Sequence, residues 1–334
     1  MKKHMGEPMK RLRAALAAVA MAAALIPSAA AWAAEWPAKP VRIIVPYAAG
    51  GANDLLARVF AERLSEVFGQ QFFVENRTGG GGIVGTEAVA RSEPDGYTLM
   101  ASGMPSHVLA PAMNAKNAGF DPVRDFTHIA YLGGPPNMFV VHASSPVKSF
   151  KELIDLMRSQ PNGVEYVSPS IGSVGNMVAE YVASKEKLKL VHVAYRGGGA
   201  AILDLVAGHV KVGSMTLSTT LQHIRSGALR PLAISSAQRV PELPDVPTLV
   251  ELGYPELVVT TWYALSGPAG LPRDIVERLN REVNKAMEVP QVRDHLAQEM
   301  VQSRPMTPEE ITAFMKSEVD KWVPVVKAMN IQLQ

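Results

Sequence analysis

The sequence predicts an α/β protein with two lobes, each built on a mainly parallel sheet flanked by helices. Short β-branched segments alternate with helical segments almost throughout the chain, which is typical of βαβ units. Without an expected export signal, the chain has 301 residues, a size at which a single hydrophobic core usually stops growing. Two Gly/Pro-rich connections, at 133–136 and 260–268, divide it further.

The N-terminus has the order of regions that is typical of a secretory signal peptide. Basic residues from Lys2 to Arg13 precede an apolar run at 14–26, and Ala31-Trp32-Ala33 provides a cleavage site. The apolar run is shorter than the ~20 residues that span a bilayer as a helix. We therefore expect residues 1–33 to be removed and the mature protein to be soluble outside the cytoplasm.

Charge and cysteine content exclude several classes of function. The formal net charge of +2 becomes −2 once residues 1–33, with five basic residues and one acid, are removed. Nucleic-acid binding then has no compositional support. The chain has no cysteine, which excludes disulfides, thiol chemistry and a lipid-modified Cys anchor.

Strands are predicted where β-branched and aromatic residues run between turn residues. They are Val41–Val45, Gln71–Glu75, Thr98–Ala101, Phe139–His142, Glu165–Ser168, Val191–Tyr195, Val210–Met215, Leu229–Ser235 and Val258–Leu265.

Helices are predicted between these strands, and several carry cap residues: Gly69 and Gly208 at C-termini, Ser149 and Thr307 at N-termini. The predicted helices are Asp54–Phe68, Gly85–Arg91, Phe150–Gln160, Val174–Lys185, Ala200–Ala207, Thr219–Ser226, Val246–Leu252, Pro272–Met287 and Pro308–Met329.

The two Gly/Pro-rich connections are interpreted as crossings between lobes. The first lobe is then discontinuous, with residues 34–137 and 264–334, and the second lobe is the continuous insertion 138–263. This is how a hinged, two-lobed binding protein is threaded.

The segment Val41–Arg58 passes from a strand through small residues into a helix. In such a segment, the backbone N–H groups of the loop and of the first helical turn are directed toward one place just beyond the strand. An anion is the expected guest, a carboxylate as well as a phosphate, and an ordinary strand-turn-helix corner is the alternative. Asp54 could orient waters, bind a ligand amino group or cap its own helix. The candidate ligand-binding residues are Tyr47, Ala48, Ala49, Gly51, Asn53 and Asp54.

Four other strand ends carry small, hydroxyl-bearing or N–H-exposing residues. Ligands of open α/β sheets lie beyond the carboxyl ends of the strands, so we expect these loops to face a common cleft as a polar, non-catalytic anion site. Arg196 is expected in a rim or hinge ion pair rather than as a direct ligand. The candidates are Ser102, Ser106, His107, Ser168, Ser170, Ser173, Asn176, Tyr195, Arg196, Gly197 and Thr216.

Motifs for catalysis, metals and nucleotides are weak or absent. Residues 80–85 match G-x-G-x-x-G, but Asn76-Arg77-Thr78 separate them from the strand, so a flexible turn is preferred over a nucleotide site. There is no H-E-x-x-H and no G-x-S-x-G. An enzyme would need a pair such as Ser106 with His107, which are adjacent in a loop and rarely meet in the required geometry. We expect no catalytic residue, metal or cofactor.

The mature chain resembles the Bug-type extracytoplasmic solute receptors of tripartite tricarboxylate transporters. The resemblance is carried by blocks whose order and spacing are specific together: Pro46-Tyr47, Gly50-Gly51, Asp54, Ala57-Arg58, Val74–Arg77, Gly79, Gly81-Gly82, Pro94–Leu99, Phe120–Pro122, Asp125-Phe126, Ala194–Gly197, Asp204-Leu205, Gly208, Val210, Leu243–Thr248 and Pro268–Gly270.

The resemblance implies a periplasmic binding protein of the Venus flytrap type that closes on a small organic carboxylate and delivers it to transporter membrane subunits. In such receptors, backbone amides and ordered waters of the first βα loop, here Tyr47–Asp54, hold a ligand carboxylate. The other lobe contributes Ser168–Asn176 and Tyr195–Gly197. The resemblance also makes the Gly79–Gly82 cluster a structural turn. We expect a monomer.

Two positions depart from the family pattern. Asn176 stands where a His is common, and Lys211 stands where an acid is common, so no specific solute is implied. Two alternatives stay open: a ligand-sensing protein that acts on a signalling partner without transport, and an extracytoplasmic hydrolase.

Overall fold

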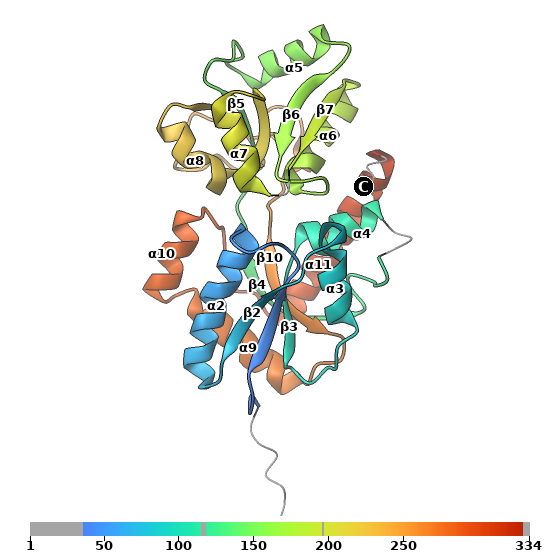
Figure 1. Cartoon of the computed structure of the whole chain (residues 1–334), viewed down its shortest axis with the longest axis vertical. Coiled ribbons are helices and arrows are strands. Elements are labelled where there is room, and N and C mark those ends of the chain that lie inside the picture. The colour runs from blue at the N-terminus through green and yellow to red at the C-terminus, as the bar shows by residue number, and fades with distance from the viewer. Residues whose placement is uncertain (1–35, 115–117, 196, 330–334) are drawn as a thin grey trace, which may run out of the picture. The chain divides into compact units, whose positions relative to one another are not determined.

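The strands form two five-stranded sheets within the part of the chain that the computed structural model describes, residues 36–114, 118–195 and 197–329 (Figure 1). The expected signal peptide lies outside the described residues. The first sheet has the order β2-β1-β3-β10-β4 and contains β1 (Val41–Val45), β2 (Phe72–Asn76), β3 (Thr98–Gly103), β4 (Phe126–Gly133) and β10 (Tyr263–Pro268). The second has the order β7-β6-β8-β5-β9 and contains β5 (Asn137–His142), β6 (Val164–Ser168), β7 (Leu190–Ala194), β8 (Val212–Thr216) and β9 (Leu229–Ile234).

Each sheet is mainly parallel with one antiparallel strand. In the first sheet, β1 pairs in parallel with β2 and β3, and β10 is antiparallel to both β3 and β4. In the second, β6 is parallel to β7 and β8, and β5 is antiparallel to both β8 and β9. The predicted α/β fold with two mainly parallel sheets is therefore confirmed.

Helices connect the strands and cover the sheets. They are α2 (Ala52–Phe68), α3 (Ile83–Ala90), α4 (Ala110–Met113), α5 (Phe150–Ser159), α6 (Val174–Glu186), α7 (Gly198–Ala207), α8 (Leu217–Arg225), α9 (Arg273–Ala286), α10 (Pro290–Gln298) and α11 (Pro308–Met329). Shorter helical turns are η1 (Gly80–Gly82), η2 (Pro105–Leu109) and η3 (Pro255–Leu257), of which η2 is a π-helix.

The alternation of β5 side chains places helices on both faces of the second sheet. Phe139 and Val141 belong to a buried cluster with residues of α6, whereas Met138 and Val140 belong to a cluster with residues of α7 and α8. Successive side chains of a strand point to opposite faces, so α6 covers one face and α7 and α8 cover the other. Burial of these apolar side chains is the main driving force for folding.

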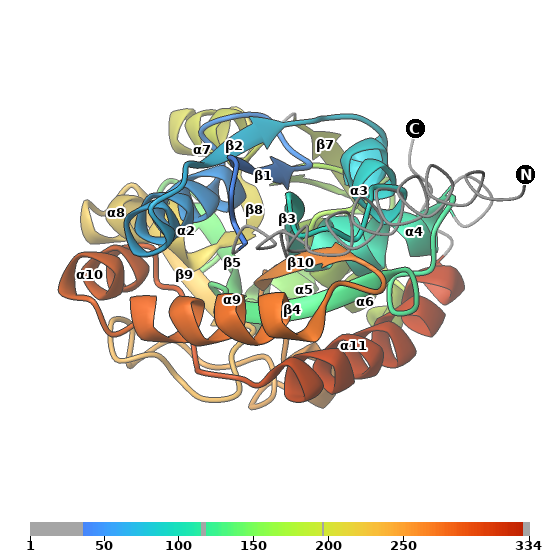
Figure 2. The same ribbon diagram turned by 90° about the horizontal axis from the view of Figure 1, so that it is seen from below.

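The first sheet is covered in the same way. Helix α2 contacts β1, β2 and β3 and packs beside α9, while α9 and α11 both pack on β4 (Figure 2). Ile44 of β1 and Met100 of β3 are fully buried together with Val89 of α3. This arrangement places the starts of α2 and α3 beyond the carboxyl ends of β1 and β2.

The chain passes between the two sheets twice, and the two connections are joined by hydrogen bonds. The first runs from β4 to β5 through 134–136, and the second leads into β10. Thr261 N donates to Pro135 O at 2.9 Å, and Pro136 forms an antiparallel bridge with Thr260. Both sheets lie within one unit, Lys39–Gln334. The lobe bounds 34–137, 264–334 and 138–263 remain a prediction.

Some element predictions were wrong. Strand β4, the η2–α4 segment and α10 were not predicted, and the last strand begins at Tyr263 rather than Val258. The predicted helix at 246–252 is a series of turns, because Leu249 N donates to Ile234 O at 2.8 Å and ties the segment to β9. None of the helices in the described part of the chain is long and apolar enough to cross a membrane.

Candidate functional site

Helix α2 begins without a side-chain cap. Its N-cap is Gly51, with φ −79° and ψ 164°, and no side chain accepts a hydrogen bond there. Within the described chain, the N–H groups of Ala52, Asn53 and Asp54 have no hydrogen-bond partner. By contrast, Ser149 caps α5 by accepting from Glu152 N at 3.2 Å. The start of α2 therefore keeps the donors and the positive end of the helix dipole that an anion requires.

Asp54 holds this loop in place. Its carboxylate accepts from Gly50 N at 2.9 Å, from Arg58 Nε and Nη2 at 3.0 Å each, and from Asn76 Nδ2 at 2.8 Å. The same Asn76 amide donates to Tyr47 O at 3.0 Å. Burial opposes ionisation, but the bonds from Arg58, Gly50 and Asn76 outweigh it and lower the pKa of Asp54. Its side chain, 2% exposed, fixes the loop and has no free oxygen for a solute.

Tyr47 and Ser106 meet beside the glycine turn. Tyr47 Oη donates to Gly81 O at 3.3 Å. A Cβ at Gly82 would lie 2.8 Å from Ser106 Cβ and 3.1 Å from Tyr47 Oη, so three loops that follow β1, β2 and β3 converge here. Burial raises the pKa of Tyr47, while the Ser106 hydroxyl lowers it. Tyr47 is therefore a neutral hydroxyl at physiological pH.

Three of the other candidates on this sheet are buried in its packing. Ser102 is fully buried, and its hydroxyl donates to Ala264 O at 3.0 Å. Asn53 donates to Ala101 O at 2.9 Å. The His107 ring, 1% exposed, packs edge-on against Phe126 with centroids 4.4 Å apart. We therefore leave the side chains of these three residues out of the proposed ligand contacts.

The burial of His107 predicts that the protein loses stability in acid. Burial lowers the pKa of His107 well below 6.5 and that of neighbouring His128 to about 4. The unfolded chain, with His pKa values near ~6.5, then binds more protons than the native state. The stability that depends on keeping these two rings neutral is fully present above pH ~6.5 and is lost as the pH falls toward 4. In denaturant titrations, H107L should reduce the loss in unfolding free energy between pH 7.5 and 5.0 by up to about 2 kcal/mol. An unchanged pH dependence would contradict this account.

The loop from Ser168 to Asn176 bonds mainly to itself and to its neighbours. Ser168 Oγ lies 2.8 Å from His192 Nε2, and Ser173 Oγ donates to Ser170 O at 2.8 Å. Ser173 caps α6, because its hydroxyl accepts from Asn176 N at 3.2 Å. The Ser168 and Ser173 hydroxyls and the Asn176 amide are thus occupied, which leaves backbone N–H groups and the Ser170 hydroxyl as the donors of this loop.

The next two loops of the second sheet adjoin it. Gly197 N donates to Pro169 O at 2.9 Å, and a Cβ at Gly198 would lie 3.5 Å from Thr219 Cγ2. Helix α7 has Gly197 as its N-cap and no side-chain cap. Its first N–H groups, at Gly198 to Ala200, have no partner within the described chain.

Tyr195 and Thr216 flank these loops. Tyr195 donates its hydroxyl to Asp204 Oδ2, while burial raises its pKa to about 12. Thr216 Oγ1 lies 3.2 Å from Ser218 Oγ and 3.1 Å from Thr219 Oγ1. Arg196 lies outside the described residues.

The predicted residues thus gather at the carboxyl ends of the strands, separately in each sheet. Ala48, Ala49 and Gly51 are exposed beside the start of α2. The structure adds Gly82 to the first group and Ser218 and Thr219 to the second. Ser218 and Thr219 lie two and three residues after Thr216 in the sequence, so their hydroxyls could have been found by extending that loop.

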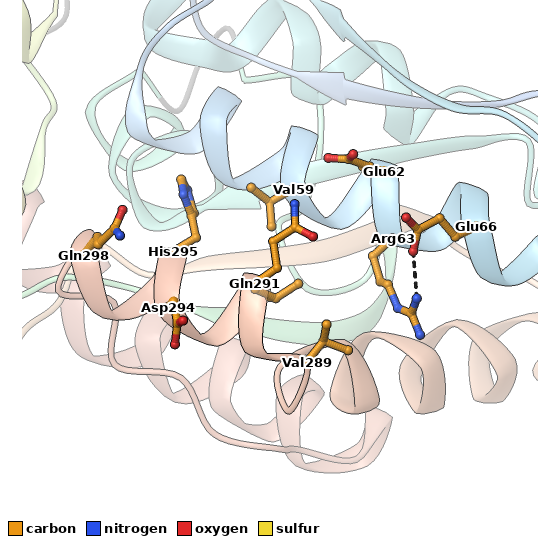
Figure 3. Close-up of a pocket in the computed structure, with 10 residues that line it drawn as sticks. Val59, Glu62, Arg63, Glu66, Val289, Gln291, Asp294, His295 and Gln298 are labelled. Carbon is orange, nitrogen blue, oxygen red and sulfur yellow. Dashed lines mark hydrogen bonds and ion pairs between the residues drawn. The ribbon is translucent and has the colours of Figure 1, made fainter.

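Two grooves in the described part of the chain lie away from the candidate residues. One of about 330 Å³ lies between α2 and α10 and is lined by residues such as Glu62, Glu66 and His295 (Figure 3). Another of about 430 Å³ lies beside α4 and α11 and includes Phe120 and Val323. Neither contains a candidate residue. No group of His, Asp and Glu suited to a metal occurs among the residues that the structure describes.

Comparison with known proteins identifies the family. The sequence profile of the tripartite tricarboxylate transporter family receptor, TctC, matches residues 56–331. The chain belongs to this family. The resemblance to Bug-type receptors is therefore confirmed, and the TctC family is one of solute-binding receptors rather than of enzymes.

Individual TctC relatives cover nearly the whole chain. BugT of Bordetella pertussis is 32% identical over 299 residues, which is 90% of this chain and 92% of BugT. An R. palustris protein solved with adipate is 30% identical with a TM-score of 0.80, and the match covers 89% of this chain and 99% of that one. MatC from Rhodopseudomonas palustris with bound malate is 29% identical with a TM-score of 0.79, and the match covers 87% and 100%.

Proposed function

We propose that this protein is a periplasmic receptor that captures a small organic carboxylate in a cleft between its two lobes. The lobes are taken as residues 34–137 with 264–334, and 138–263. The receptor then delivers the solute to the membrane subunits of a tripartite tricarboxylate-type transporter. We further propose that it acts as a monomer, without catalysis, after removal of residues 1–33.

The observation that carries the proposal is the uncapped start of α2 behind a rigid loop. The N–H groups of Ala52, Asn53 and Asp54, which have no partner among the described residues, lie at the carboxyl end of β1, where α/β sheets bind ligands. An anion at a helix N-terminus gains about 0.3–1 kcal/mol, and up to about 2 kcal/mol when it is partly buried. The relatives solved with adipate and malate support a carboxylate over a phosphate.

The second sheet offers matching donors. The N–H groups of Gly198, Gly199 and Ala200 at the start of α7 could take the other end of a dicarboxylate. Neutral donors suit a receptor that must release its solute. Backbone N–H groups and waters can hold the carboxylate by hydrogen bonds without a buried positive charge. Partnership with a transporter is supported by the family alone.

Native mass spectrometry of the purified mature protein, followed by thermal shift with adipate and malate, tests the proposal. We expect a bound organic acid of small mass and a rise in melting temperature with at least one dicarboxylate. The ligand should be recovered unchanged. Turnover of the bound compound, or no stabilisation by any carboxylate in a broad panel, would contradict the proposal.

A further inference from the structure

A chain of three hydrogen bonds connects Glu180 of α6 to the loop that follows β6. Tyr166 Oη donates to Glu180 Oε1 at 2.7 Å, and Asn176 Nδ2 donates to Tyr166 Oη at 2.8 Å. Asn176 Oδ1 in turn accepts from Gly172 N at 3.1 Å. Tyr166 is fully buried and Asn176 is 2% exposed, so water does not compete for the middle of the chain.

The carboxylate sets the direction of every bond in this chain. Burial raises the pKa of Tyr166 and also that of Glu180, whose Oε1 accepts whether or not the other oxygen bears a proton, so the tyrosine keeps its proton and donates it to Oε1. The Tyr166 hydroxyl oxygen then accepts a hydrogen bond from the Asn176 side-chain NH2 group. The carbonyl oxygen of that amide consequently faces Gly172 N.

A second contact braces the same loop. Ser168 Oγ lies 2.8 Å from His192 Nε2, and the His192 ring stacks on Tyr166 with centroids 4.9 Å apart. The side chains of Ser168, Ser173 and Asn176 are therefore occupied in holding the turn. What remains for a solute is the Ser170 hydroxyl and the backbone of the turn, including the N–H groups of Ser170 and Ile171, which have no partner within the described chain.

We propose that Glu180 is a positioning residue for solute binding. Acting through Tyr166 and Asn176, it fixes the turn at 170–173 so that the backbone N–H groups of the turn are presented to the solute. The inference rests on the proposed receptor function, and it assigns to Glu180 and Tyr166 a part in affinity although neither touches the solute.

The decisive variants are E180L and E180Q. In E180L the Tyr166 hydroxyl has lost its acceptor and turns to Asn176 Oδ1, so the amide rotates and its NH2 group meets Gly172 N–H. Two donors then face each other, and the turn is displaced. In E180Q the side-chain carbonyl still accepts from Tyr166, so the direction of the bonds is kept.

Glu186 provides a matched control on the same helix. Its carboxylate also accepts from a tyrosine hydroxyl, that of Tyr254, at 2.9 Å. Its carboxylate also accepts from Arg158, and none of the bonds that it makes within the described residues leads to the turn. E186L therefore removes the same kind of bond from α6 without affecting the loop.

The test combines amide hydrogen exchange of residues 168–177 without ligand and calorimetric titration with adipate and malate. We expect E180L to speed exchange in the turn about tenfold and to weaken binding of the better dicarboxylate about tenfold. In E180Q, the exchange rate of the turn and the dicarboxylate affinity should each stay within twofold of the wild-type value. E186L should lower the melting temperature and leave the exchange rate of the turn and the dicarboxylate affinity unchanged. If E180L does not fold, Y166F with Y254F as its control takes its place.

Two results would overturn the inference: unchanged exchange in the turn of E180L, or equal losses of affinity in E180L and E186L. The proposed function fails separately, if wild-type protein binds neither these two dicarboxylates nor any other carboxylate of the panel. The exchange measurement does not depend on a ligand and decides the role of Glu180 in the turn even then.

Discussion

G51V should abolish dicarboxylate binding while the protein folds normally. Gly51 has φ −79°, which valine adopts without strain, and a Cβ there would meet only Ala48 O at 3.7 Å. The branched side chain would stand in front of the N–H groups that open α2. We expect affinity to fall at least about 100-fold, which is about 2.7 kcal/mol, while the unliganded melting temperature changes by about 2 °C or less.

P272V is the matched control for G51V. Pro272 is the N-cap of α9, which has no side-chain cap, and its φ is −53° and its ψ 135°. P272V therefore introduces the same valine side chain at a comparable helix N-terminus. It lies outside the candidate site and should leave affinity unchanged. Binding by G51V that equals wild type in calorimetric titration would refute the role given to the first loop.

D54A should cost the largest amount of stability of any single change in the candidate site. It leaves Gly50 N, the Asn76 amide and the Arg58 guanidinium without their shared acceptor. Loss of a buried, charged hydrogen-bond partner costs about 1.5–3 kcal/mol, and the half-exposed Arg58 keeps part of its hydration. We expect about 2–3 kcal/mol less unfolding free energy in urea titration, together with about tenfold weaker binding because the loop is no longer held.

D155A is the control for this change. Asp155 pairs with Lys151 one helical turn away, the same spacing as between Asp54 and Arg58, but both side chains of the Asp155 pair are exposed. Exposed pairs contribute little to stability, so D155A should leave the unfolding free energy nearly unchanged in the same urea titration. A D54A variant as stable as D155A would show that Asp54 does not hold the loop.

The strand-helix alternation made most of the fold predictable. Strand β1 was predicted with its observed bounds because Val41–Val45 is β-branched and ends at Pro46. Strand β4 was missed because it contains His128, a polar residue whose burial depends on partners distant in sequence: its ring lies 3.1 Å from Ser266 Oγ of β10. The prediction of a helix at 246–252 was wrong for a similar reason, because the bridge between Thr248 and Ile234 overrides the local helical pattern.

The candidate site was predictable in its position but not in the role of each side chain. Sequence patterns locate loops at strand ends, and Gly51 is indeed exposed at a helix start. They cannot tell a hydroxyl that faces solute from one that braces a loop, because that depends on neighbours such as His192 for Ser168. His107 likewise follows a strand, yet its ring is in the core, because η2 turns it toward Phe126.

A crystal structure of the mature protein with adipate or malate tests the central claim most directly. We predict one carboxylate within about 3.2 Å of the Ala52 or Asn53 amide nitrogen, and the remainder of the ligand against amides of the second sheet at 170–175 or 198–200. A ligand that contacts one sheet alone, or that sits in the groove between α2 and α10, would contradict the account.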